Sequence, residues 1–255
     1  MVIHDAVKPA IDIQGLSVTF PSRGGAVRAL RDVSFSVEPG TVFGFLGPNG
    51  AGKTTAIHVL LGFLQPTAGT ATLLGQPVSE KIARERLGYL AENPDTYLFL
   101  TGRELLTMTG RLFRLRGAEL AKRVDRLLEE VGLSAAADRR IASYSRGMRQ
   151  RICMAQSLVN DPDLLILDEP TGGLDPLGRL EIRRLIADRR AAGKTVFFSS
   201  HELSEVELVC DQVAILVRGR LAAQGKTSEL VGSNESLERY FINLATAETD
   251  RKEDG

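Results

Sequence analysis

One octapeptide constrains the fold of this chain more than any other feature. It reads Gly47-Pro48-Asn49-Gly50-Ala51-Gly52-Lys53-Thr54 and fits the pattern G-x-x-x-x-G-K-[ST] of a phosphate-binding loop. The apolar run 41–46 before it has the length of a buried strand, and the segment 54–64 after it is predicted to be a helix. This order of strand, loop and helix predicts an α/β domain. A glycine turn that only joins the two elements is the disfavoured alternative, because both elements stand where a phosphate site needs them.

The fixed positions of the loop have physical roles. Glycines allow successive backbone N–H groups to point at phosphate oxygens, beside the positive end of the following helix. Lys53 is expected to reach the β- and γ-phosphates of a nucleotide, and the Thr54 hydroxyl to bind Mg²⁺. The loop 47–54 and Thr55 after it are therefore the expected nucleotide contacts.

A pair of carboxylates supports this interpretation. Asp168 and Glu169 follow four apolar residues, 164–167, which are typical of a buried strand. Beside a phosphate-binding loop, we expect Asp168 to lie near the Mg²⁺ shell and Glu169 near an attacking water. A strand that ends in Asp-Glu is a weak signal by itself, and the loop upstream makes the functional interpretation strong.

The patterns of strands and helices divide the chain into three regions. Strand-like runs dominate up to residue 92, the segment 101–158 shows helical patterns, and strands alternate with helices over 164–217. Such alternation is typical of a mostly parallel sheet covered by helices. We therefore expect an α/β P-loop nucleotide hydrolase fold with a mostly parallel core sheet, an N-terminal antiparallel β subdomain and an inserted α-helical subdomain.

The 255 residues are predicted to form a single domain. Its expected parts are a catalytic core of residues 1–92 and 160–225, a helical subdomain of residues 93–159, and a short C-terminal helical segment and tail of residues 226–255. Cys153 and Cys210 lie far apart, without metal or redox spacing, and are expected to be small buried hydrophobic residues.

Charge and hydropathy exclude several classes of protein. Lys and Arg number 32, as do Asp and Glu, so no broad basic field for nucleic acid is present. No stretch reaches the roughly 18 consecutive apolar residues of a membrane helix. We expect a cytoplasmic chain that binds no nucleic acid and reaches a membrane only through a partner. In the predicted helix 177–190, four arginines are expected on a solvated face that also holds Glu181 and Asp188: Arg183, Arg184, Arg189 and Arg190.

Further motifs stand in a characteristic order. Residues 144–151 read Tyr-Ser-Arg-Gly-Met-Arg-Gln-Arg, residues 172–176 read Gly-Gly-Leu-Asp-Pro, and His201 follows Phe-Ser-Ser. Together with the loop and Asp168-Glu169, this order resembles the ATP-binding subunit of ABC transporters over nearly the full length of the chain. The resemblance makes these segments the signature motif, the D-loop and the switch histidine, and Phe20 the aromatic residue that stacks on adenine.

The resemblance implies an ATPase that works as a pair. Two subunits face head to tail, and each ATP lies between one P-loop and the opposite signature motif, where Ser145 and the Gly147 backbone contact the γ-phosphate. Glu169 acts as general base on the attacking water. His201 holds the γ-phosphate and bridges to Asp175 of the opposite subunit. ATP and Mg²⁺ are the implied ligands, and closure and reopening of the pair drive a membrane partner.

Three positions depart from the family pattern. Glu92 stands where the family has the glutamine of its Q-loop, but a carboxylate can still bind Mg²⁺. Arg146 replaces a glycine of the common signature, and its cation either contacts the phosphates or points to solvent. Gly172 stands where serine is frequent and removes a hydroxyl. The expected metal ligands are Thr54, Asp168 and Glu92. The expected catalytic residues Lys53, Glu169 and His201 are retained, so we expect a competent ATPase.

The departures are similar to the ABC-2 group, which includes drug and antibiotic exporters, and the segment 236–241 resembles the terminal helix of that group. The resemblance implies a separate integral-membrane permease, and a second copy of the chain or a paralogous ATPase subunit, at the inner face of the cell membrane. In the family, a groove between helical subdomain and core receives the permease. Part of the apolar cluster 97–100 is expected to line this groove, unless it packs inside the helical subdomain.

A soluble ABC-type ATPase that acts on ribosomes or nucleic acid is the main alternative. Members that act in translation usually carry two cassettes in one chain, and repair members carry long coiled coils, whereas this sequence has one cassette and no sustained heptads. A small GTPase or kinase is disfavoured, because no Asn-Lys-x-Asp guanine motif is present and the signature would be unexplained. The sequence therefore favours a transport ATPase, with export as the expected direction.

Overall fold

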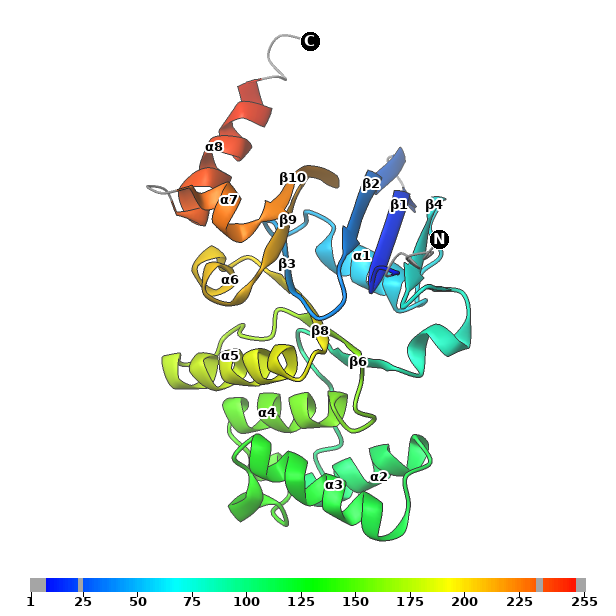
Figure 1. The fold of residues 1–255 in the computed structure, drawn as a ribbon, viewed down its shortest axis with the longest axis vertical. Coiled ribbons are helices and arrows are strands. Elements are labelled where there is room, and N and C mark those ends of the chain that lie inside the picture. The colour runs from blue at the N-terminus through cyan, green and yellow to red at the C-terminus, as the bar shows by residue number, and fades with distance from the viewer. Residues whose placement is uncertain (1–7, 23–24, 233–235, 251–255) are drawn as a thin grey trace, which may run out of the picture.

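The computed structural model describes residues 8–22, 25–232 and 236–250. The molecule is elongated, with two sheets in its middle part (Figure 1). Helices α2 (Gly102–Leu112), α3 (Gly117–Glu130) and α4 (Arg146–Ser157) gather at one end, and α7 (Thr227–Val231) and α8 (Leu237–Asp250) lie at the other. None of the helices in the described ranges is long and apolar enough to cross a membrane.

The central sheet has six strands in the order β10-β9-β3-β8-β7-β6. The strands are β3 (Val42–Leu46), β6 (Leu87–Leu90), β7 (Leu164–Asp168), β8 (Thr195–Ser200), β9 (Gln212–Val217) and β10 (Arg220–Lys226). All neighbours are parallel except β9 and β10, which form an antiparallel hairpin. Every residue of β3, β7 and β8 is buried, as expected for parallel strands that are covered on both faces.

A second, antiparallel sheet has the order β2-β1-β4-β5. Its strands are β1 (Ile11–Ser22), β2 (Gly25–Val37), β4 (Ala68–Leu73) and β5 (Gln76–Pro77). Helix α1 (Lys53–Leu60) and one face of the central sheet share a core with this sheet. Phe35 of β2 stacks on Phe43 of β3 and on Phe197 of β8, with ring centroids 5.5 and 6.2 Å apart. The second sheet therefore covers the face of the central sheet on which α1 lies.

Alternate residues of the central strands point into a second core on the opposite face. Val42 and Leu46 of β3 and Phe198 of β8 pack there with side chains of α4, α5 (Pro176–Ala191) and α6 (Leu203–Val209). Short 3₁₀ turns complete the connections at Lys81–Arg84, Ser134–Ala136 and Ile141–Ser143. Thr101 starts α2 with a capping box, because its side chain accepts from Glu104 N while the Glu104 carboxylate accepts from Thr101 N.

The expected fold class is confirmed, and the differences are local. β2 begins at Gly25, whereas the alternation in the sequence predicts a strand only over 33–37. β10 was not predicted. The helix predicted over 54–64 ends at Leu60, and Gly62 follows with a left-handed φ of 71°. The predicted division at residues 92, 159 and 225 stays a prediction, and its last residues, 251–255, lie outside the described ranges.

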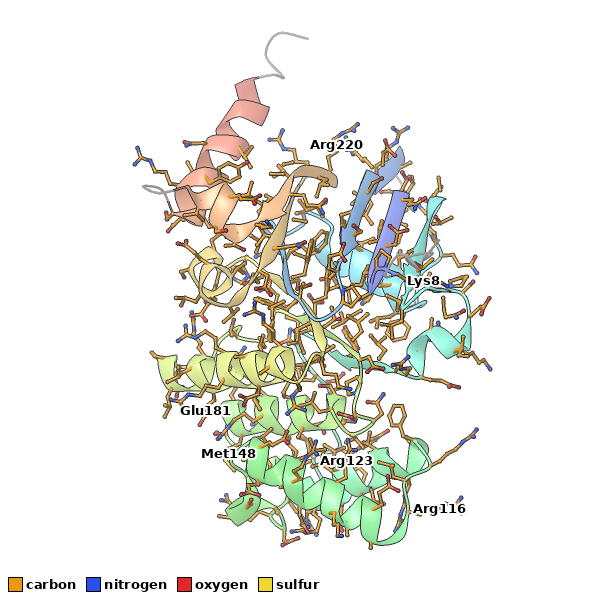
Figure 2. All side chains as sticks on the ribbon, viewed as in Figure 1. Lys8, Arg116, Arg123, Met148, Glu181 and Arg220 are labelled. Atoms are coloured by element: carbon orange, nitrogen blue, oxygen red, sulfur yellow. The ribbon has the colours of Figure 1, made fainter. Side chains whose placement is uncertain are left out.

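The prediction of a solvated arginine face on α5 is wrong for Arg183 and Arg189, whose side chains are 24% and 14% exposed, whereas Arg190 is 54% exposed and also has an acidic partner. Arg183 pairs with Glu205 at 3.1 Å, Arg189 pairs with Glu130 at 3.0 Å, and Arg190 pairs with Asp211 at 2.5 Å. Their acidic partners belong to other elements, so helical spacing could not find them. Glu181 of α5 likewise pairs with Arg151 of α4 at 3.2 Å, where the two helices lie next to each other (Figure 2).

Both cysteine thiols are expected to be unreactive in the folded protein. Burial raises the pKa of Cys153 to about 11 and holds the pKa of Cys210 well above its usual value. At pH 8 a thiol of pKa 11 is about one part in a thousand thiolate, against about a quarter for an ordinary cysteine. A disulfide reagent added at pH 8 should label two thiols in guanidinium chloride and almost none in buffer. Labelling of either thiol within minutes in buffer would contradict this burial.

Candidate functional site

Residues 48–54 of the loop form the floor of a cleft of about 330 Å³ at the carboxyl ends of β3 and β7. Ala29 of β2, Thr55 of α1, Glu92 after β6 and Glu169 after β7 complete its lining. The ends of parallel strands meet at one edge of a sheet, and this brings the two carboxylates to the loop. The sequence prediction that the loop, Glu92 and Glu169 lie together therefore agrees with the geometry.

Two glycines of the loop are required by close packing. A Cβ atom on Gly47 would lie 2.4 Å from the Leu216 carbonyl oxygen of β9. Gly52 has a left-handed φ of 109°, and a Cβ atom there would lie 2.6 Å from the Ala29 carbonyl oxygen. The loop is thus pressed against two strands, and α1 begins directly after it at Lys53. The backbone N–H groups at the start of α1 are therefore held at the cleft.

A chain of ionisable side chains links the loop to the residue that follows β8. Lys53 Nζ donates to the Gly47 carbonyl oxygen at 2.7 Å and lies 3.2 Å from Glu169 Oε1. The other carboxylate oxygen, Oε2, contacts His201 Nδ1 at 2.9 Å and accepts from His201 N at 3.3 Å. Lys53 and Glu169 are each only 7% exposed, so they form a buried ion pair. The structure thus joins the three predicted catalytic residues through one carboxylate.

The backbone of Glu169 is unusual for a residue other than glycine. Its φ is 48°, in the left-handed region where such residues are rare and often mark functional positions. Glu169 N donates to Ser199 O at 3.2 Å and to Ser199 Oγ at 3.1 Å, which stabilises this conformation. The Ser199 hydroxyl also donates to Asp168 Oδ1 at 2.5 Å. One serine of β8 therefore positions both carboxylates.

The oxygen groups of the cleft fit Mg²⁺. Asp168 is 2% exposed and ends β7, while Thr54 in the first turn of α1 and Glu92 are exposed at the cleft. Carboxylate and hydroxyl oxygens suit this ion, which usually binds through few protein ligands together with substrate phosphates. Thr54, Asp168 and Glu92 remain the predicted ligands.

Besides Gly47 and Gly147, three predicted nucleotide contacts are not part of the cleft lining among the described residues. Ser145 caps α4, because its hydroxyl accepts from Met148 N at 3.2 Å. Asp175 caps α5, because its Oδ1 accepts from Gly178 N at 2.7 Å. Phe20 lies on β1 opposite Val27 and is 39% exposed. In a single chain these residues serve as helix caps and a strand residue, and their contacts with nucleotide stay predictions.

Residues 30–172, more than half of the chain, match the family described as ABC transporter. The chain belongs to the ABC transporter family. An uncharacterized ABC transporter ATP-binding protein of Nostoc sp. is 49% identical over 232 residues, which are 86% of this chain and 69% of that protein. The Nod factor export ATP-binding protein I of Rhizobium johnstonii is 39% identical over 224 residues, 87% of this chain and 71% of that protein. This chain therefore shares the ATP-binding cassette of these proteins, and the matched region spans about seven tenths of their length.

Solved structures agree with this membership. An ATP-binding subunit of an ABC transporter superposes with a TM-score of 0.83 at 29% identity, over 92% of this chain and 99% of the other. A second, cbiO1 of Clostridium perfringens, superposes with a TM-score of 0.79 at 29% identity, over 96% and 99% of the two chains. That protein is described as part of the transporter complex cbiONQ. The chain is an ABC-type ATPase. Segments 144–151 and 172–176 are called the signature motif and the D-loop below, after the family resemblance of the sequence.

The signature arginine of this ABC ATPase does not point freely to solvent. Arg146 Nη2 donates to the Gly172 carbonyl oxygen of the D-loop at 3.2 Å. Gly173 follows with a left-handed φ of 67°, and a Cβ atom there would lie 2.3 Å from the Arg146 guanidinium. The cation and the glycines of the D-loop therefore fit one another. Arg146 is also exposed, as the solvent alternative from the sequence expected, and it makes this additional contact within one chain.

Two side chains near the ABC site were not predicted from the sequence. Ser199 lies inside an apolar strand, and only the pairing of β7 with β8 places its hydroxyl between Asp168 and Glu169. Gln150 of α4 is buried and donates to the Pro170 carbonyl oxygen at 3.1 Å, directly after Glu169. A polar residue on a buried helix face was the available hint for Gln150.

Substitution of Ser199 by Ala tests the positioning of both carboxylates. We expect the rate of ATP hydrolysis to fall about 10- to 100-fold, as for other supports of metal-binding groups. Loss of a buried hydrogen bond should also lower the free energy of unfolding by about 1–3 kcal/mol. Ser157→Ala is the matched control, because Ser157 is equally buried but its hydroxyl donates to Met154 O of its own helix. Equal hydrolysis rates in the two variants would contradict the role of Ser199.

Proposed function

We propose that this chain hydrolyses ATP to power a separate membrane permease and that the transport is export. The observation that carries the proposal is the Lys53–Glu169–His201 chain at the phosphate-binding loop. It provides a cation for the phosphates, a carboxylate for the attacking water and a histidine beside that carboxylate. Export is supported by the relatives named for Nod factor export.

The geometry suggests how hydrolysis proceeds. The triphosphate lies along the loop 47–54, and its negative charge competes with Glu169 for Lys53. Glu169, thus released from Lys53, accepts a proton from a water whose oxygen attacks the γ-phosphorus, while the bond to the β-phosphate oxygen breaks and leaves ADP. Thr54, Asp168 and Glu92 would hold Mg²⁺, which would supply charge neutralisation for the phosphates. His201 orients the carboxylate through Nδ1 and presents its other ring nitrogen to the γ-phosphate.

Two chains, or one chain and a paralogue, are proposed to share each ATP. Gly147 supports this proposal, because a Cβ atom there would meet no heavy atom within 4 Å and its φ is not left-handed. Neither packing nor backbone geometry within the chain requires this glycine, whereas close approach of a phosphate to the start of α4 would. Ser145 and Asp175 are exposed at the starts of α4 and α5, where an opposite subunit could reach them.

A cavity of about 360 Å³ is the proposed docking site of the permease. β6, the segment after it and helices α2 and α4 contribute its lining, which includes Pro94, Asp95 and Phe113. The cluster 97–100 is not part of the lining of this cavity, and Tyr97 and Phe99 are 53% and 69% exposed. Phe113 is 42% exposed and is the apolar side chain that a permease helix would cover.

Glu169→Gln tests the chemistry and the pairing of subunits. The amide keeps the shape of the carboxylate but cannot accept the proton, so hydrolysis should fall at least about 100-fold. Bound ATP should then hold two chains together, with a dimer in light scattering at saturating ATP and Mg²⁺. A hydrolysis rate like that of the wild type would contradict the general base. A monomer with bound ATP would contradict self-pairing and point to a paralogue or the permease.

Affinity purification from detergent-solubilised native membranes tests the transport assignment. We expect the tagged chain to retain a polytopic membrane protein in stoichiometric amount. Phe113→Ser should reduce this recovery severalfold and leave the hydrolysis rate of the isolated chain unchanged. Leu208→Ser is the control, because Leu208 is 68% exposed on α6, outside the cavity. Recovery of ribosomal or DNA-bound proteins in place of a membrane protein would contradict the transport assignment and favour the soluble alternative.

A further inference from the structure

Arg179 contacts two loops of the site at once. It lies in the first turn of α5, where Nε donates to the Leu174 carbonyl oxygen of the D-loop at 3.2 Å. Its Nη1 forms an ion pair with the Glu202 carboxylate and lies 4.0 Å from Glu205 Oε1. The Arg179 and Glu202 side chains are 31% and 22% exposed, so the pair is partly shielded from water.

Each end of this bridge is next to a motif residue. Leu174 immediately precedes Asp175, which caps α5. Glu202 immediately follows His201, and its backbone N–H donates to Ser200 Oγ at 2.9 Å. Glu202 starts α6 but makes no side-chain cap, because its carboxylate is directed to Arg179. The guanidinium therefore joins the backbone of the D-loop to the residue beside the switch histidine.

The bridge is not needed to hold α5 and α6 together. One turn further along α5, Arg183 donates to both carboxylate oxygens of Glu205 at 3.1 Å. That ion pair joins the same two helices without contact to Leu174 or Glu202. The Arg183 side chain is 24% exposed, similar to Arg179. The chain thus contains two ion pairs of the same chemistry, of which one contacts the loops of the site.

We propose that Arg179 is a positioning residue for hydrolysis. It fixes the switch loop relative to the D-loop, so that His201 stays against Glu169 Oε2. A planar guanidinium suits this task, because its donors have fixed directions and can serve a carbonyl and a carboxylate together. The proposal rests on the proposed ATP hydrolysis, and it extends the site beyond the motif residues.

Arg179→Met and Arg183→Met form the matched pair of variants. In Arg179→Met we expect kcat for ATP to fall about 10- to 100-fold, because misplacement of a catalytic group lowers the rate by about this factor. KM should change less than about twofold. Arg183→Met should keep kcat within about twofold of the wild type.

Glu202→Gln should resemble Arg179→Met, and the double variant should be no worse than either, because the two side chains act as one unit. Arg179→Lys should recover part of the rate. An equal fall of kcat in Arg183→Met, or an unchanged kcat in Arg179→Met, would overturn the proposal.

A second readout does not depend on turnover. The chain has three histidines, so the ring signals of His201 can be followed by NMR in the full-length protein. Arg179→Met should shift the His201 signals and leave those of His58 in place, whereas Arg183→Met should shift neither. An unshifted His201 signal in Arg179→Met would overturn the proposal. A wild-type chain that hydrolyses no ATP would instead contradict the proposed function, and the His201 shift would still decide whether Arg179 positions it.

Discussion

The site depends on one buried ion pair, between Lys53 and Glu169. A buried carboxylate is costly unless it is paired and hydrogen-bonded, and Glu169 meets this condition with Lys53 on one oxygen and His201 on the other. These residues follow β3, β7 and β8, and the sheet order places β8 between the other two strands. The parallel sheet thus brings three distant segments of the chain to one carboxylate. The rest of the fold, two hydrophobic cores on opposite faces of that sheet, holds this edge in place.

The helices that flank the sheet carry the motifs that are outside the cleft. The signature segment starts α4, the D-loop starts α5, and His201 precedes α6. Contacts of Arg146 with Gly172 and of Arg179 with Leu174 and Glu202 join the starts of these helices. Ion pairs farther along the helices, such as Arg189 with Glu130, join the helix bodies to their neighbours. Arginine is suited to these positions, because its donors are rigid and its charge persists when it is partly buried.

Much of this fold and site was predictable from the sequence, and the remainder has a physical reason. Three local patterns occur where the sequence indicated them: the loop 47–54, His201, and the strand that ends at Asp168. The role of Ser199 depends on strand pairing with β7, and the role of Arg179 depends on contacts 23 residues away, so no local pattern reveals either. β10 is a half-exposed edge strand with weak alternation, and for this reason it gave little signal. Helical spacing placed the α5 arginines on one face but could not identify the acids opposite them.

Exposure separates the motif residues into two groups. Lys53, Asp168 and Glu169 are nearly inaccessible and hydrogen-bonded or paired within the chain. Ser145 and Asp175 are exposed, and their side-chain oxygens are engaged in capping helices whose N-terminal ends face outward. A helix N-terminus attracts anions through its free N–H groups, and a capping side chain leaves several of these groups available. The buried group thus gathers at the loop 47–54, while the exposed group lies at two helix N-termini outside the cleft, where it is open to contact from outside the chain.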